Sequence, residues 1–155
     1  MPNMLEIIEN DSTPLEDVKD VPPLPAGTYL AQIVGHAEFI KSSQKQTNGI
    51  QFTVRLLQPR DDVDRDRLNN YLEAANRTIG DVQLKHTIWE SPYWDQNLKR
   101  FLVDSLDISP KLGRKEALSE VPGKQLNVSL INRSSTSQDG TVRLVHDIGG
   151  TARAL

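Results

Sequence analysis

The sequence lacks cysteine altogether, and aromatic residues make up only 5 % of its 155 positions. The absence of thiols excludes disulfides, thiolate zinc sites, iron–sulfur clusters and cysteine nucleophiles. The start of the chain also lacks the basic stretch, apolar core and cleavage site of a secretion signal. No apolar run approaches the roughly 18 residues that a membrane span requires. We therefore expect a cytoplasmic protein without a membrane partner.

Motifs for catalysis and for metal binding are missing as well. No serine occupies a nucleophile elbow, and no glycine-rich phosphate loop occurs. His36, His86 and His146 are predicted to lie in strands, the last two facing inward, and they lack the spacing of a zinc site. The carboxylates of residues 61–64 lie next to arginines and lack the glycine of a calcium loop, so they indicate a solvated, salt-bridged insertion. We expect no enzymatic activity, no cofactor and no metal.

Charge is distributed unevenly along the chain. Residues 1–20 hold six acids and one base, a net charge of −5, whereas the whole chain carries −3, so residues 21–155 carry +2. Prolines at positions 22, 23 and 25 favour extended geometry. We predict a flexible acidic arm over residues 1–25, a weakly basic domain over residues 26–149 and a loose tail over residues 150–155. The arm could be a solvating tail, could cover a basic groove in place of DNA, or could bind replication or recombination proteins.

Polar and apolar residues alternate over five stretches, which predicts five strands. These are residues 28–40 with a kink at Gly35, then 49–58, 81–90, 124–132 and 141–148. Ser91-Pro92, followed by apolar residues three or four positions apart, predicts a helix over residues 92–106. Residues 59–80 form an insertion that includes a short helix over 64–76. Residues 110–121 form either a second short helix or an ordered loop.

The order of these elements predicts the fold class. Strands with one apolar face bury it by closing into a barrel or by packing as a sandwich. Five strands with a helix between the third and fourth suit a mainly β, Greek-key barrel of the OB-fold type, in which the helix plugs the bottom. A β-sandwich that carries one additional helix is the structural alternative.

Several short segments carry a resemblance to a known family over roughly residues 22–149. They are the runs LPAGTY at 24–29, SSQK at 42–45, GIQF at 49–52 and LKRFL at 98–102, together with the two closing strands. In these segments the chain resembles a family of bacteriophage OB-fold proteins that are described as single-stranded-DNA-binding or as uncharacterised. The resemblance implies a role in phage DNA replication or recombination, in the cytoplasm of the host cell.

A barrel of this kind binds a nucleic-acid strand across its second and third strands, between the loops that join strands one to two and four to five. The residues predicted to face outward on those two strands are Gln51, Thr53, Arg55, Lys85, Thr87 and Trp89. The first loop adds Lys41 and Lys45, the last loop adds Arg133, and Arg143 could lie on the same side. Cations would meet phosphates, and the indole would stack on a base for about 1–3 kcal/mol. The alternative is a merely solvated polar face, with Trp89 tucked under the following helix.

These observations predict a non-catalytic protein that binds single-stranded DNA and protects it during replication or recombination, with homo-oligomerisation left open. Few aromatic residues and a weakly basic body indicate modest affinity, or binding through several subunits in a row. The competing interpretation is a protein-interaction or virion-associated barrel that does not bind nucleic acid.

Overall fold

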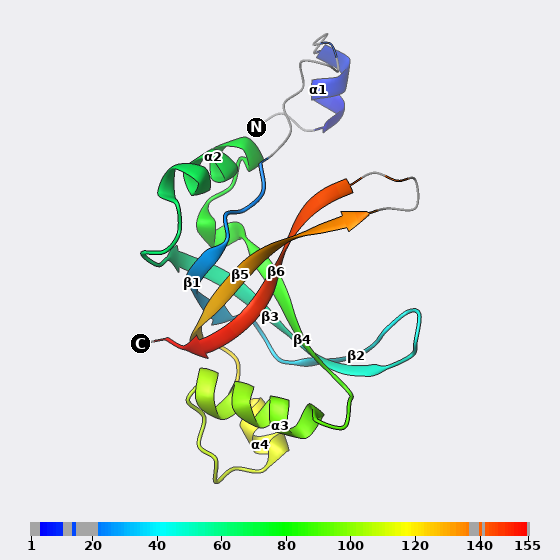
Figure 1. Ribbon diagram of the computed structural model, residues 1–155, viewed down its shortest axis with the longest axis vertical. Coiled ribbons are helices and arrows are strands. Elements are labelled where there is room, and N and C mark those ends of the chain that lie inside the picture. The colour runs from blue at the N-terminus through cyan, green and yellow to red at the C-terminus, as the bar shows by residue number, and fades with distance from the viewer. Residues whose placement is uncertain (1–3, 11–13, 15–21, 137–139, 141, 155) are drawn as a thin grey trace.

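Over the residues that the structure describes, the chain forms one antiparallel sheet of six strands with short helices beyond its ends (Figure 1). The computed structural model describes residues 4–10, 14, 22–136, 140 and 142–154. The strands pair in the order β2–β3–β1–β5–β6, and β4 pairs with β3. Their bounds are β1 Gly27–Ile33, β2 Glu38–Lys41, β3 Asn48–Pro59, β4 Gln83–Trp89, β5 Gln125–Thr136 and β6 Val142–Arg153. The helices are α1 Met4–Asn10, α2 Arg65–Ala75, the 3-10 turn η2 Ile79–Asp81, α3 Trp94–Lys99, the π-helix η3 Arg100–Ser105 and α4 Arg114–Ser119.

The first predicted strand is divided into two, which is why the sheet has six strands and not five. β1 pairs with residues 54–59 of β3 and β2 pairs with residues 48–51, so both lie along the same edge of that strand. Between them Gly35 has a φ of +72°, a conformation that residues with a side chain rarely adopt. The kink predicted at Gly35 is therefore present. His36 lies in this break and is exposed, so its prediction as a strand residue was wrong.

The sheet does not close into the predicted barrel. In the described part of the chain β4 pairs only with β3 and β6 pairs only with β5, so no ladder joins β4 to β6. Instead, η3 lies against β6, with the Ser105 and Thr151 hydroxyls 2.7 Å apart. Arg153 Nη2 also donates to the Val103 carbonyl at 3.3 Å. A helix thus contacts the strand that would otherwise have completed the barrel.

The helix predicted over residues 92–106 is confirmed as α3 and its continuation η3. Its buried side chains are Leu98, Phe101, Leu102, Ser105 and Leu106. The Phe101 ring centroid lies 4.6 Å from that of Phe52 on β3 and 4.7 Å from that of His86 on β4. The helix therefore packs into the end of the sheet, as the apolar spacing predicted. Residues 110–121, left open as helix or loop, contain the short helix α4.

The insertion contains the predicted helix, α2. Asp64 caps it by accepting hydrogen bonds from the backbone N–H groups of Asp66 and Arg67, both at 3.1 Å. Leu68 and Tyr71 are buried and join the main core. The carboxylates at 61, 62 and 64 are exposed, as predicted for a solvated insertion. The predicted ion pairs with the neighbouring arginines are not formed among the described residues, whose ion pairs lie elsewhere.

The two ends of the domain extend further than the sequence patterns indicated. Leu24 and Pro25 are fully buried, and the Tyr29 hydroxyl donates to the Pro25 carbonyl at 2.7 Å, so the core begins before residue 26. Residues 150–153, assigned above to a loose tail, belong to β6 and pair with β5. Of the acidic arm the structure describes α1, residue 14 and residues 22–25, and the other positions lie outside the described residues.

Asp62 connects the insertion to the start of β1. Its carboxylate accepts hydrogen bonds from the Thr28 backbone N–H at 3.0 Å and from the Thr28 hydroxyl at 2.9 Å. These bonds favour the ionised form and hold the pKa of Asp62 below its usual value of 3.8. A carboxyl with a lowered pKa stabilises the folded state above its unfolded pKa, and this stabilisation is lost as the pH falls through the folded pKa.

We expect Asp62→Asn to lower the free energy of unfolding at pH 7 and to reduce the further loss of stability below about pH 4. The amide keeps one acceptor for Thr28 but carries no charge, so the variant has less to lose on acidification. Urea unfolding at pH 7 and pH 3 measures both effects. Asp61→Asn, at the exposed neighbouring position, is the matched control. An Asp62→Asn protein with the wild-type pH dependence would contradict this role.

Candidate nucleic-acid interface

The ladder between β3 and β4 separates their side chains into an inner and an outer set. Phe52, Val54 and Ile88 point into the core and are buried. The register pairs Gln51 with Thr87 and Thr53 with Lys85, so the alternate residues share the opposite side. We call this outer set the β3–β4 face; its residues are Gln51, Thr53, Arg55, Lys85, Thr87 and Trp89. The structure therefore brings together the six strand residues that the sequence analysis selected.

Two cations on the β3–β4 face are oriented by neutral partners. Lys85 Nζ donates to the Thr53 hydroxyl at 2.7 Å, and Arg55 Nη2 donates to the Gln32 side-chain carbonyl at 3.0 Å. The ion pairs formed by described residues involve Arg114, Arg133 and Arg153 and neither of these two side chains. Their positive charges are thus held in place and are not neutralised by a carboxylate.

Trp89 ends β4 on the same face. It is 42 % exposed and lies opposite Gly49 in the ladder. A Cβ atom at Gly49 would lie only 2.7 Å from Cε3 of Trp89, so the indole rests directly against the backbone of that glycine. The alternative in which Trp89 is covered by the following helix is wrong. A flat, partly exposed aromatic ring on the same face as two cations is suited to stacking with a base.

The β3–β4 face also includes residues that the sequence analysis missed. Register places Glu38 of β2 beside Gln51, and Ile40 beside Gly49. Gln32 of β1 lies beside Arg55, and its amide donates to the Gly123 carbonyl at 3.2 Å, which fixes the group that holds the arginine. Alternation along the first predicted strand was the available signal, but the break at residues 34–37 interrupts it.

The two lysines of the first hairpin are placed differently from the strand residues. Lys41 lies opposite Asn48, one position on from Ile40, so the ladder directs its side chain to the face opposite Trp89. Lys45 is exposed in the turn that follows, where the backbone N–H groups of Lys45 and Thr47 donate to the Ser42 hydroxyl at 3.3 and 3.1 Å. Neither lysine is therefore shown to share the β3–β4 face.

The arginines of the second hairpin make no described contact with the β3–β4 face. Arg133 is exposed on β5 and forms an ion pair with Asp147 of β6, whose carboxylate neutralises the charge of the arginine. Arg143 lies in β6, and its side chain is outside the described residues. Figure 1 shows the hairpin of β2 and β3 and the ends of β5 and β6 that face it projecting toward the same side of the molecule.

The two histidines that were predicted to face inward pack against aromatic rings. Burial lowers the pKa of His86, whose ring lies against that of Phe101, and lowers the pKa of His146, whose ring meets Tyr71 edge-on. Within the described ranges, no group of three or more histidine or acidic side chains could hold a metal ion. None of the described helices combines the length and the apolar character that crossing a membrane requires.

No protein-family model matches the chain, and no curated protein sequence matches it. Among solved structures, the chain is similar to yeast RPA bound to ssDNA, with a TM-score of 0.35 and 9 % sequence identity. The alignment covers 96 % of this chain and 85 % of that one. Two structures with a TM-score this low share too little geometry to indicate a common fold or function.

Proposed function

We propose that this chain is a non-catalytic protein that binds single-stranded DNA across the β3–β4 face and protects it during replication or recombination. One observation supports this proposal above the others. Lys85 and Arg55 lie on the same exposed face as Trp89, and each is held by a neutral side chain. Such an arrangement matches a ligand that alternates negative charges with flat aromatic rings.

Each group on the face has a role in this interaction. Lys85 and Arg55 contact phosphates and release their counterions, a contribution that does not depend on base sequence. Trp89 stacks on a base, and every base offers an aromatic face, so this contact also tolerates any sequence. The amide of Gln51 and the hydroxyls of Thr53 and Thr87 supply hydrogen bonds to phosphates or base edges. The result is binding without marked sequence preference.

The order of strands supports the choice of this face. Taking β1 and β2 together as one bent strand, the chain runs strand, strand, insertion, strand, helix, strand, strand, which is the order of an OB-fold. We infer an OB-like architecture that is open between β4 and β6. In that architecture β3 and β4 correspond to the strands whose surface binds oligonucleotides. An origin in a bacteriophage stays a prediction from the sequence segments.

Titration of a fluorescent oligothymidylate at several salt concentrations tests the proposal. Two phosphate contacts predict a slope of log K against log[salt] near −1.4, since each contact on a single strand contributes about −0.7. Lys85→Gln reduces the magnitude of that slope by about 0.7. Lys111→Gln, at an exposed lysine outside the face, is the control and leaves the slope unchanged. An absence of binding at low salt would overturn the proposal and favour a protein-interaction module.

Glu38 is the one acidic side chain that the ladder places on the β3–β4 face beside Gln51, among the described residues. Glu38→Gln should raise the affinity for the oligonucleotide about threefold at low salt, because a repulsion across about 7 Å of water amounts to ~0.6 kcal/mol. The gain shrinks as salt is added. Glu116→Gln, on the exposed side of α4, is the control. An unchanged affinity in dilute buffer would place the bound strand away from β2.

A further inference from the structure

Helix α1 presents an apolar stripe that the described body leaves uncovered. Met4, Leu5 and Ile8 are 72, 64 and 67 % exposed, and their spacing places them on one side of the helix. A helix of seven residues is too short to be stable alone in water, where about 12–15 residues are needed. Burial of its apolar stripe against another surface would stabilise such a short helix.

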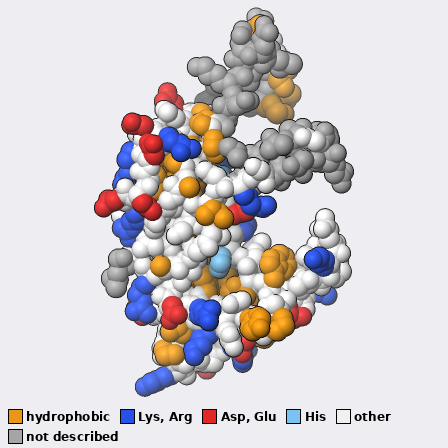
Figure 2. Space-filling view, viewed as in Figure 1, with side chains coloured by type: hydrophobic (Ala, Val, Ile, Leu, Met, Phe, Trp, Pro, Cys, Tyr) orange, Lys and Arg blue, Asp and Glu red, His pale blue; other side chains and the backbone are white. Residues whose placement is uncertain are grey.

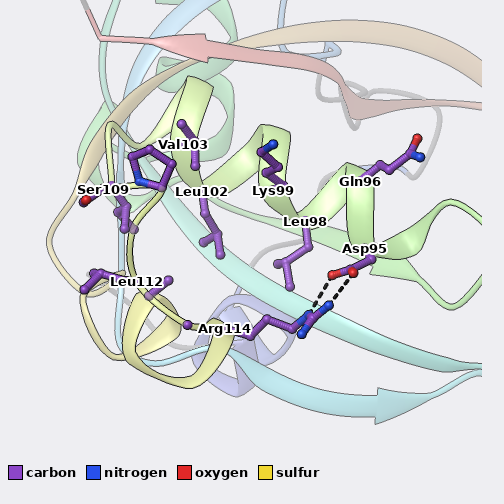
Figure 3. A pocket seen from close by; sticks show the side chains of 13 residues that line it. Asp95, Gln96, Leu98, Lys99, Leu102, Val103, Ser109, Leu112 and Arg114 are labelled. Atoms are coloured by element: carbon purple, nitrogen blue, oxygen red, sulfur yellow. Dashed lines mark hydrogen bonds and ion pairs between the residues drawn. The ribbon is translucent and has the colours of Figure 1, made fainter.

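A pocket of about 310 Å³ lies between α3–η3 and the segment that leads into α4 (Figure 3). Figure 3 shows Leu98 and Leu102 pointing from the helix toward this segment, with Leu112 approaching from the other side. One end is closed by Arg114, whose Nε donates to the Asp95 carboxylate at 2.7 Å and whose guanidinium carbon lies 5.8 Å from the Trp94 ring centroid. We call this the α3–α4 pocket. Its apolar lining and polar rim suit the side chains of an amphipathic helix.

Charge distinguishes this pocket from a second apolar depression of about 280 Å³, which Phe39, Ile50, Ile88 and Glu90 help to line. The charged residues that line the α3–α4 pocket are Lys99, Arg114 and Asp95, which give it a net charge of +1. Lys99 lines its rim. Figure 2 shows Lys and Arg side chains, with Asp and Glu among them, over the lower end of the molecule, where Figure 1 places α3 and α4. The helix α1 contains two acids and no base, so electrostatic attraction favours the α3–α4 pocket over the second depression, whose described lining includes Glu90 and no base.

We propose that α1 of one copy of this chain docks into the α3–α4 pocket of a second copy. Leu5 and Ile8 enter the apolar lining, and Glu9 lies near Lys99. Figure 1 places α1 at the end of the molecule opposite α3 and α4, so the contact is head to tail. Because the helix and the pocket are different surfaces, each copy can insert its α1 into one neighbour and receive the α1 of another. Copies can then associate in an open row, or in a ring if the last copy binds the first. This inference does not depend on DNA binding.

Cross-linking between single-cysteine variants tests the contact, because the chain has no cysteine of its own. Met4→Cys protein is mixed with Ser109→Cys protein, whose substitution lies on the lining of the pocket. The control partner is Phe39→Cys, in the second depression and 76 % exposed. We expect the Ser109 pair to form the disulfide-linked heterodimer about tenfold faster, since docking raises the effective concentration of the thiols. Equal rates for the two partners would overturn the proposal.

The choice between a second copy and the same chain is decided with the double variant Met4→Cys/Ser109→Cys. When this variant is exposed to oxidant at a concentration too low for association, its two thiols should not form a disulfide. A disulfide within one chain under these conditions would overturn docking to a second copy. Light scattering, which measures the mean mass of the particles in solution, supplies the second readout. Glu9→Lys and Lys99→Glu should each reduce this mass, and the combined variant Glu9→Lys/Lys99→Glu should restore it. Ile8→Asp should abolish association while leaving the circular dichroism spectrum of the sheet intact. A failure of the charge swap to restore association would contradict the placement of Glu9 beside Lys99.

Discussion

Replacement of Trp89 by alanine should lower the affinity for an oligothymidylate by about 5- to 150-fold, which corresponds to the ~1–3 kcal/mol of stacking between a base and an aromatic side chain. The indole is 42 % exposed and rests on Gly49, so its orientation is already set before a base arrives. A ring that needs no reordering loses little entropy on binding. For this reason we expect Trp89 to have a larger effect than either cation.

The two tryptophans of the chain allow a direct control. Trp94 begins α3, is half-buried, lies near Arg114 and lines a depression with Ile50 and Ile88, which the register places on the side opposite Trp89. Trp94→Phe should therefore retain both the affinity and the quenching of tryptophan fluorescence by DNA. Trp89→Phe should abolish the quenching but keep part of the affinity, because a smaller aromatic ring still stacks.

Gly49→Ala provides a variant that moves the indole without removing it. The new methyl group would lie 2.7 Å from Cε3 of Trp89, closer than carbon atoms can approach, so the ring must leave its position on the backbone. Affinity should fall by less than in Trp89→Ala, and the tryptophan emission of the free protein should shift. If Trp89→Ala bound the oligonucleotide as tightly as the wild type, the stacking role would be wrong. An affinity unchanged only in Gly49→Ala would instead show that stacking tolerates a displaced ring.

The composition of the β3–β4 face was predictable because alternation along a strand determines which side chains share a face. Gln51, Thr53 and Arg55 alternate with buried apolar residues over an uninterrupted stretch of β3. Lys41 was assigned to a loop, but it ends β2, where the register places its side chain on the face opposite Trp89. The hydrogen bond from Arg55 to Gln32 could not be predicted from the sequence either, because it depends on the register between β1 and β3.

The end of β6 illustrates a second limit. Glycines at 149 and 150 resemble a loop, which led to the prediction of a tail. In the structure a Cβ atom at Gly149 would lie 2.9 Å from Cγ2 of Ile131 on β5, so the close approach of this side chain requires a glycine inside the strand. The register also shifts between Ser129 and Leu130. Local composition therefore indicated a loop, while the contact across strands kept the segment in the sheet.

Phe101→Ala should lower the free energy of unfolding by about 3–5 kcal/mol, the usual cost of truncating a buried aromatic residue. Phe101 is 3 % exposed on η3, and its ring centroid lies 4.6 Å from that of Phe52 and 4.7 Å from that of His86. Because no ladder joins β4 to β6 among the residues that the structure describes, side-chain packing by this helix stabilises the end of the sheet. Urea unfolding followed by circular dichroism measures the loss. Tyr93→Ala, at an aromatic residue 63 % exposed just before α3, should cost no more than about 0.5 kcal/mol.

The same variant should change the pH dependence of stability. Burial lowers the pKa of His86 in the folded protein, so the stabilisation from its neutral form is present above the unfolded value of 6.5 and is lost as the pH falls below it. Removal of the Phe101 ring admits water to the imidazole and brings its pKa back toward 6.5. The loss of stability between pH 7 and pH 5 should therefore be smaller in Phe101→Ala, while the part due to His146 persists. An unchanged pH dependence would show that Phe52 and β4 alone exclude water from His86.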